Sequence, residues 1–383
     1  MGGDKNPIRS RRLVKIKDTI RMDETRPIRT GEEIDAAKLN AYLHTTLADL
    51  KGKITIEQFP AGSSNLTYLV RVGDAEYVLR RPPIGNSVKT AHDMSREFNV
   101  LSKLSDVYAP APKPLLFCDD ASVIGSEFYL MERRNGLVIR GRVPDAQARA
   151  SARAIRDLNI SQDFRLAVCD SFIRNLADLH ALDYKAAGLG DLGHPDGYNR
   201  RQVEGWTKRY FAAKTDDWAE LEHAIGWLNV NIPPESGASL IHNDYKFDNI
   251  MLLPSDLTKI TAVLDWEMVT VGDPLMDLGT TLGYWMSPDA GDEMLSMPFN
   301  PRVLMENISR AELVEMYAVE RGCEVSNMLF YYVFGTFKIA VIAQQIYARF
   351  GKGFTQDERF ATFGKFVEAL GRIAANAIKG GSI

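Results

Sequence analysis

Hydrophobic residues recur at every second position in one early part of the chain. Between 54 and 83 the sequence ITIEQFPAGSSNLTYLVRVGDAEYVLRRPP alternates apolar and polar side chains, and Gly62 and Gly73 interrupt the alternation. This pattern predicts three successive strands joined by short connections. Apolar residues at helical spacing flank the strands at 36–50 and around 88–105, so we expect a helix on each side.

The pattern changes after a further strand, which is expected at 127–136. Helical periodicity dominates 145–183 and 309–378, and the convincing strand signals between them are the short segments SLIHN, NIMLL and ITAVLDW. Such an order predicts a small, sheet-rich lobe joined to a larger helical lobe. We place the small lobe at 31–131 and the helical lobe at 132–383.

Composition indicates a large core and a nearly balanced charge. The 383 residues are 45% hydrophobic, enough for one large or two moderate domains. Because 50 acidic residues accompany 46 basic ones, no nucleic-acid partner is expected. Residues 1–30, with nine Lys or Arg against four Asp or Glu, are expected to form a flexible basic extension, and binding to an anionic partner is the alternative.

Cysteine usage and hydropathy favour a cytoplasmic protein. Cys118, Cys169 and Cys323 form neither a CxxC pair nor a zinc-ligand pattern, so reduced thiols are expected. The start of the chain lacks the apolar core of a signal peptide. The apolar segment 328–350 contains Lys338 near its middle, which favours a buried helix over a membrane span.

The segment LIHNDYKFDNIML, residues 240–252, places polar side chains between two apolar strand ends. In it, His242, Asp244 and Asn249 have the spacing H-x-D-x-x-x-x-N, which is that of a kinase catalytic loop. Downstream, AVLDWE puts Asp265 at the end of an apolar run. One loop and one strand end are therefore expected to converge on a metal ion and a transferable phosphate.

These residue types suit phosphoryl transfer from ATP or GTP to a hydroxyl group. A carboxylate such as Asp244 can accept the hydrogen bond, and later the proton, of the acceptor hydroxyl. Magnesium prefers hard oxygen ligands, which Asn249 and Asp265 supply. Lys246 is placed to balance negative charge on the transferring group. Taken singly, such residues also occur in turns and on surfaces, and it is their order that favours catalysis.

Further parts of a nucleotide site are expected upstream. A flexible turn that covers the phosphates would lie between two strands, at Gly62, Ser63, Ser64 and Asn65. This signal is weak, because any hairpin can look similar and the form G-x-G-x-x-G is absent.

The third predicted strand offers a basic residue for the phosphates. Val78 and Arg80 share one face of it, opposite to Leu79. We expect Val78 to lie over the adenine and Arg80 to face the phosphates, held by Glu97 of the next helix. A solvated arginine and an exposed glutamate are the alternatives.

These motifs together resemble a known family. The segments YVLRRPP, REFNVL, FYLMERRNG, LADLHALD, LIHNDYKFDNIML and VLDWEMVTVGDPLMDLG are similar to those of aminoglycoside phosphotransferase-like kinases, most of all to the branch found fused to acyl-CoA dehydrogenases. The resemblance implies an α+β, bilobal protein-kinase-like fold, with a small antiparallel sheet in the N-terminal lobe and a mainly helical C-terminal lobe. It also implies a functional link to an acyl-CoA dehydrogenase.

The resemblance assigns a role to each motif. Asp244 corresponds to the catalytic aspartate, and Asn249 and Asp265 correspond to the magnesium ligands. Arg80 and Glu97 correspond to the ion pair that positions phosphate. The hinge between the lobes, whose backbone holds the adenine edge, corresponds to Met131, Glu132, Arg133 and Arg134.

Two further residues are expected to support the catalytic loop, and two others differ from the pattern of the family. Asp277 and His242 are expected to brace the catalytic loop. Asn243 stands where the antibiotic kinases usually have glycine, which would change the local turn. Arg80 stands where the general pattern has lysine; its planar fork can bridge two phosphates, and arginine is common there in the dehydrogenase-fused branch.

The acceptor is predicted to be a small hydroxylated molecule. The C-terminal stretch EALGRIAANAIKGGSI is not acidic, which argues against a polycationic aminoglycoside. The segment 284–305 contains four methionines, and we expect either a lid with an adaptable apolar face or core-facing methionines: Met286, Met294, Met297 and Met305. By analogy with the dehydrogenase-fused branch, a lid would admit a hydroxyacyl thioester.

Two other functions remain open. A pseudokinase could bind nucleotide and regulate a partner without turnover, although the intact set of Asp244, Asn249 and Asp265 speaks against it. A protein kinase is disfavoured because no DFG or APE segment with an activation loop is present.

Overall fold

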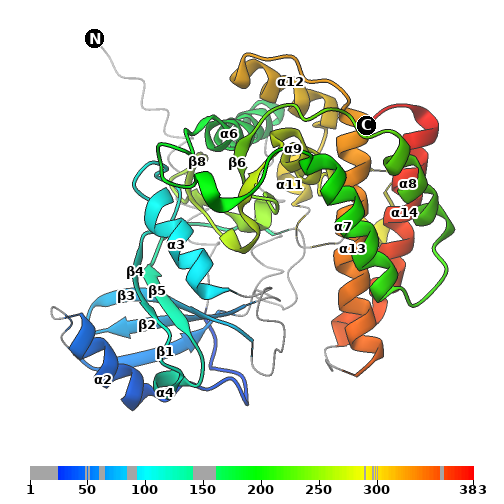
Figure 1. Cartoon of the computed structure of the whole chain (residues 1–383). Helices are drawn as coiled ribbons and strands as arrows, with labels where there is room; N and C mark the ends of the chain where they lie inside the picture. The colour runs from blue at the N-terminus through cyan, green and yellow to red at the C-terminus, as the bar shows by residue number, and fades with distance from the viewer. Residues whose placement is uncertain are drawn as a thin grey trace, which may run out of the picture.

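The computed structural model describes two lobes (Figure 1). The described residues are 25–47, 50, 52–59, 65–83, 93–140, 161–288, 290–295, 297, 299, 301–353 and 358–383. Most of the predicted basic extension, up to residue 24, and the turn residues Gly62, Ser63 and Ser64 lie outside them. The expected bilobal α+β fold is confirmed.

The smaller lobe is built on one antiparallel five-stranded sheet. In spatial order its strands are β1 (Ile54–Gln58), β2 (Leu66–Val72), β3 (Ala75–Arg81), β5 (Phe128–Glu132) and β4 (Pro114–Cys118). The three strands expected from alternation are confirmed as β1 to β3. Strand β4 was not predicted, because prolines surround it; it lies at the edge of the sheet, where a missing N–H is tolerated.

The two faces of this sheet belong to different cores. Leu79 packs on the outer face with α2 (Ala36–Thr46) and α4 (Ala121–Ile124). Val78, its neighbour on β3, joins the inner core, which includes α3 (Met94–Leu104) and continues into the helical lobe. The face assignment made from the sequence is thus confirmed, and Arg80 lies on the side that faces the other lobe.

The larger lobe is mainly helical. Its helices are α6 (Gln162–Ala181), α7 (Tyr198–Ala213), α8 (Ala219–Val230), α9 (Pro274–Gly283), α10 (Asp292–Leu295), α11 (Arg302–Met305), α12 (Arg310–Arg321), α13 (Met328–Gly351) and α14 (Phe363–Gly380). Two small antiparallel pairs accompany them: β6 (Ser239–Ile241) with β9 (Thr270–Gly272), and β7 (Ile250–Leu253) with β8 (Asp256–Val263). Helices α7 to α11 and strand β9 were not predicted.

Helix α13 is the central helix of the larger lobe and packs on α7, α9 and α14 (Figure 1). By length and composition it could cross a membrane, but 78% of its apolar window is buried within the protein, as in the core helix that was expected. It approaches α9 closely at Gly335 and Gly279, where an added Cβ would meet backbone atoms at 2.1 and 2.2 Å. Only glycine permits this approach, which fixes α9 beside α13.

Candidate active site

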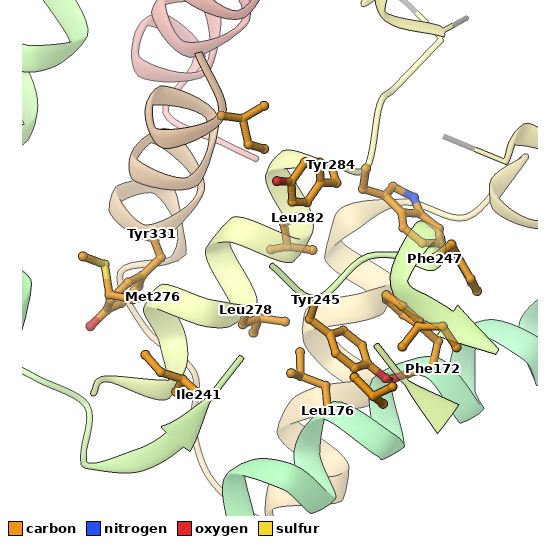
Figure 2. Packing of buried hydrophobic residues seen from close by; sticks show 14 of the residues in the cluster. Phe172, Leu176, Ile241, Tyr245, Phe247, Met276, Leu278, Leu282, Tyr284 and Tyr331 are labelled. Atoms are coloured by element: carbon orange, nitrogen blue, oxygen red, sulfur yellow. Dashed lines mark hydrogen bonds between the residues drawn. The ribbon is translucent and has the colours of Figure 1, made fainter. Parts of the chain in front are cut away.

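The segment between β6 and β7 is anchored by its aromatic residues. Tyr245 and Phe247 are buried beneath it and pack on Phe172 of α6, with the rings of Phe172 and Phe247 stacked at 4.3 Å (Figure 2). The Tyr245 hydroxyl donates a hydrogen bond to the Phe172 carbonyl at 2.8 Å. Apolar residues thus hold the loop while the polar residues between them remain available for chemistry.

Asp277 of α9 braces the start of this loop. Its two carboxylate oxygens accept the backbone N–H groups of His242 and Asn243, each at 2.7 Å. His180 of α6 lies 3.2 Å from the same carboxylate. Burial alone would raise the pKa of Asp277, but the bond with His180 and the nearby positive charges outweigh it and lower the pKa. This geometry agrees with the structural role expected for Asp277.

The motif GDP-x-x-DLG explains how Asp277 is placed. Asp273 caps the N-terminus of α9 by accepting the N–H of Leu275 at 2.9 Å, and Pro274 occupies the first helical turn. Asp277 follows one turn later, on the side of the catalytic loop, and Gly279 allows the approach of α13. This short motif therefore caps the start of α9, orients the Asp277 carboxylate toward the loop and allows α13 to pack closely.

His242 also braces the loop, as expected. Its Nε2 lies 3.0 Å from the carbonyl of Leu264, and its Nδ1 accepts the N–H of Asp244 at 3.2 Å. Burial lowers the pKa of His242, so the ring is neutral and can donate at one nitrogen while accepting at the other.

Asn243 adopts a left-handed backbone conformation, with φ of 67°. Asparagine tolerates this region better than most residues, which explains how it can occupy a turn of this conformation. Lys338 of α13 donates to the Asn243 carbonyl at 2.7 Å and to its side-chain oxygen at 3.1 Å. The buried lysine noticed in the apolar helix thus holds the turn next to Asp244.

Asp244 accepts hydrogen bonds from three side chains. Lys246 lies 2.7 Å and Asn249 2.9 Å from Oδ2, while the Tyr284 hydroxyl lies 2.6 Å from Oδ1. Burial would lower the pKa of Lys246, but the neighbouring Asp244 outweighs it and raises the pKa, so the ammonium stays charged. The sequence pointed to Lys246 and Asn249 here but not to Tyr284.

Asn249 and Asp265 are brought together by backbone pairing. The N–H of Leu264 donates to the carbonyl of Asn249 at 2.8 Å, so Asp265 follows directly beside the loop. Asp265 has φ of 68°, an unusual conformation that is common where a side chain is held for function. The amide nitrogen of Asn249 bonds to Asp244, which leaves its oxygen as the group able to bind a metal.

Arg80 connects the two lobes at this point. Its guanidinium lies 3.3 Å from Glu97, 2.9 Å from Asp265 and 4.0 Å from Glu267. Burial would lower the pKa of Arg80, but these carboxylates outweigh it and raise the pKa, so the arginine is charged. The predicted pairing with Glu97 is present, and the direct contact with Asp265 is an addition.

Asn65 and the predicted hinge lie on the side of the smaller lobe. The Asn65 amide donates to Glu267 at 2.8 Å, which ties the start of β2 to the other lobe. Met131 is buried and lies opposite Val78 across strands β5 and β3. The other hinge side chains form ion pairs, Arg133 with Glu76 at 3.4 Å and Arg134 with Glu132 at 2.7 Å.

Comparison with known proteins decides the family. The profile of the phosphotransferase enzyme family, APH, matches residues 55–297. The chain belongs to this family. It is 34% identical to the acyl-CoA dehydrogenase family member 11 of Gallus gallus over 354 residues, which are 90% of this chain but 44% of that protein. The phosphotransferase chain therefore spans less than half the length of this relative.

Solved structures of phosphotransferases share the fold. A protein from Ralstonia eutropha, named as a candidate aminoglycoside phosphotransferase, has a TM-score of 0.73 at 29% identity and covers 91% of this chain and 99% of its own. Aminoglycoside phosphotransferase APH(4)-Ia in complex with ADP and hygromycin B has a TM-score of 0.55 at 14% identity and covers 88% of this chain and 97% of its own. The latter similarity shows the fold alone.

The oxygen donors of this phosphotransferase chain fit magnesium only in part. Asn249 and Asp265 offer an amide oxygen and a carboxylate, which are the hard ligands that magnesium prefers. Among the described residues there is no group of three or more His, Cys, Asp or Glu side chains suited to a metal. Water and phosphate oxygens would have to complete the coordination, as is usual for magnesium bound with a nucleotide.

The structure also bears on the methionine-rich segment 284–305. Met286, Met294 and Met305 are buried in the main core, and Met297 is half-buried. This favours the alternative of core-facing methionines over an exposed apolar lid. Replacing the buried three would disturb packing, so they are poor probes of substrate binding.

Proposed function

We propose that the chain is a small-molecule kinase that transfers the γ-phosphate of ATP or GTP to an alcohol with the help of magnesium. The observation that supports this most strongly is the convergence of Asp244, Asn249 and Asp265 with Arg80. Each of these residues is held by contacts from other elements, so the groups are positioned before a substrate arrives.

The proposed reaction needs one proton acceptor. The acceptor oxygen forms a bond to the γ-phosphorus, while the bond from that phosphorus to the β–γ bridging oxygen breaks and the nucleoside diphosphate leaves. The hydroxyl proton passes to Asp244. Lys246 and Arg80 offset the negative charge on the transferring phosphate, and Asn249 and Asp265 would hold the magnesium that neutralises the phosphate oxygens.

Charge around the loop supports an acceptor that is not a polycation. The two carboxylates of the loop each have a basic partner: Asp244 has Lys246 at 2.7 Å and Asp248 has Arg140 at 2.6 Å. The carboxylates of the loop itself are thus neutralised by basic partners, which weakens their attraction for several ammonium groups. Together with the similarity to acyl-CoA dehydrogenase family members, it favours a hydroxyacyl thioester as the acceptor.

A second candidate function is a nucleotide-binding regulatory module without turnover. One observation favours it: Tyr284 is bonded to Asp244 and Arg80 is bonded to Asp265, so both carboxylates have protein partners. A substrate and a magnesium ion would have to share or replace these contacts. The intact catalytic set favours the kinase.

An acceptor screen separates the two candidates. Protein with magnesium and ATP or GTP is mixed with hydroxyacyl thioesters, aminoglycosides, macrolides, amino alcohols and sugars, and products are weighed by mass spectrometry. Gain of one phosphate by a hydroxyacyl thioester is expected. Tight nucleotide binding with no phosphorylated acceptor would favour the regulatory module, and phosphorylation of another class would correct the acceptor alone.

A further inference from the structure

The hydrogen bonds of Asp244 leave one position for an acceptor. A carboxylate oxygen can accept about two hydrogen bonds. Oδ2 already accepts from Lys246 and Asn249, whereas among the described residues Oδ1 accepts only from Tyr284. An acceptor hydroxyl that binds without displacing a protein group must therefore use the remaining lone pair of Oδ1, beside the tyrosine.

Tyr284 is buried and held by several contacts at this position. It follows α9 directly, just beyond Leu282 in Figure 2, and is 6% exposed. The Lys246 ammonium lies over its ring at 4.9 Å, and Phe299 meets the ring edge-on at 5.0 Å. Burial raises the pKa of Tyr284, so the hydroxyl stays protonated and donates to the carboxylate.

We propose that Tyr284 is the positioning and specificity residue of the acceptor site, an inference that rests on the proposed kinase function. Its hydroxyl fixes the Asp244 carboxylate so that the free lone pair of Oδ1 receives the acceptor hydroxyl. Two donors on one oxygen lie within about 5 Å of each other. The carbon that bears the acceptor hydroxyl would therefore lie near the hydroxyl end of the tyrosine ring.

This placement determines which chemical groups are favoured next to the acceptor hydroxyl. The ring of Tyr284 is apolar on its edge and is packed against another aromatic ring, that of Phe299. Methylene groups gain free energy when they leave water for such a surface, whereas hydroxyl or ammonium groups would lose hydrogen bonds to water. The preferred acceptor is an alcohol flanked by aliphatic carbons, as in a hydroxyacyl chain, and not a sugar.

Three variants test the inference. Tyr284→Phe removes the hydroxyl and keeps the ring, and Tyr284→Leu removes both. Tyr210→Phe is the matched control, because Tyr210 is also buried in the helical lobe and donates to a carboxylate, that of Glu222, at 3.0 Å. Magnesium–ATP affinity and the melting temperature are measured first, followed by kcat and KM with a short hydroxyacyl pantetheine thioester and with glucose.

The hydroxyl and the ring should have separable effects. Tyr284→Phe should lower kcat about tenfold without changing the KM for ATP, because an oriented carboxylate is needed only during transfer. Tyr284→Leu should in addition raise the KM of the thioester and reduce its preference over glucose. Tyr210→Phe should change neither parameter.

The outcomes distinguish this inference from the function on which it rests. A wild-type protein that phosphorylates no acceptor overturns both. A wild-type protein that is active, with Tyr284→Phe equal to Tyr210→Phe in kcat, overturns the role of the tyrosine and leaves the kinase intact. If Tyr284→Leu fails to fold, Tyr284→Phe alone decides the role of the hydroxyl, and Tyr284→Met replaces the ring in the specificity test.

Discussion

The catalytic loop and the phosphate-facing strand are held in different ways. The loop around Asp244 is fixed by its own lobe, through Asp277, His242 and Lys338. Arg80 on the strand is instead fixed largely by partners across the lobes or on α3. The proposed acceptor side is thus held by its own lobe, whereas the proposed phosphate side depends on contacts that a nucleotide and a metal would rearrange.

The largest expected effect is a loss of kcat when the proposed general base, Asp244, is replaced. Asp244→Ala should lower kcat by about 10² to 10⁴, the range typical of a lost general base, while magnesium–ATP affinity stays nearly unchanged. Steady-state kinetics with the acceptor found in the screen measure it. Asp248→Ala removes a carboxylate four residues away and is the control. Equal losses in the two variants would remove Asp244 from the catalytic role.

Removing the brace should destabilise the helical lobe. Asp277→Ala leaves two backbone N–H groups and His180 without their acceptor in a buried place, so we expect unfolding to become easier by about 3 kcal/mol. Urea denaturation measures this loss. Asp217→Ala, at a fully exposed carboxylate, should show little change. A loss below about 1 kcal/mol for Asp277→Ala would show that the brace is dispensable.

Replacing Asp265 should change how magnesium affects the binding of ATP. Asp265→Ala removes one of two candidate ligands and frees Arg80 from its contact at 2.9 Å. We expect the affinity for ATP to lose its dependence on magnesium, because phosphate oxygens alone cannot replace the carboxylate. Calorimetric titration with and without the metal measures it. An affinity that still rises with magnesium would show that Asp265 is not a ligand.

The smallest change, counted per pH unit, is expected in the pH dependence of stability. Burial lowers the pKa of Lys338 from 10.5 to about 8. The negative charges of Asp277 and Asp244 raise this pKa, whereas the positive charges of Arg209 and Lys246 lower it further. Between these pH values the unfolded chain binds more protons, so stability should rise with pH there, by at most about 1.4 kcal/mol per unit.

A lysine variant isolates this contribution. Lys338→Met keeps the length of the side chain and removes the titration, so its unfolding free energy should rise less steeply with pH between about 8 and 10.5 than that of the wild type. Denaturation at several pH values gives both slopes. Parallel slopes would mean that Lys338 does not titrate in this range.

Sequence patterns predicted those strands and loop residues whose geometry depends on residues close together in the chain. Alternation gave β1 to β3 and the face on which Arg80 lies, because side chains of a strand alternate whatever surrounds it. The spacing of the loop pointed to Asp244 and Asn249, which the structure places 2.9 Å apart. Strand β4 was missed because its prolines obscure the alternation.

Contacts between distant elements could not be predicted in this way. Tyr284 reaches Asp244 because α9 is fixed against α13 by Gly279 and Gly335, and Gly335 lies 51 positions after Tyr284 in the sequence. Glu267 is similar, since its bond to Asn65 joins residues 202 positions apart. The sequence did indicate a buried polar contact for Lys338, because a lysine in an apolar helix requires a polar partner.

The most direct test of the kinase function is ³¹P NMR of the protein with magnesium, ATP and a hydroxyacyl thioester. A new phosphomonoester signal that grows as the γ-phosphate signal of ATP disappears, and that is missing with Asp244→Ala, is the predicted result. Consumption of ATP that yields inorganic phosphate alone, or a phosphomonoester that forms equally well with Asp244→Ala, would contradict it.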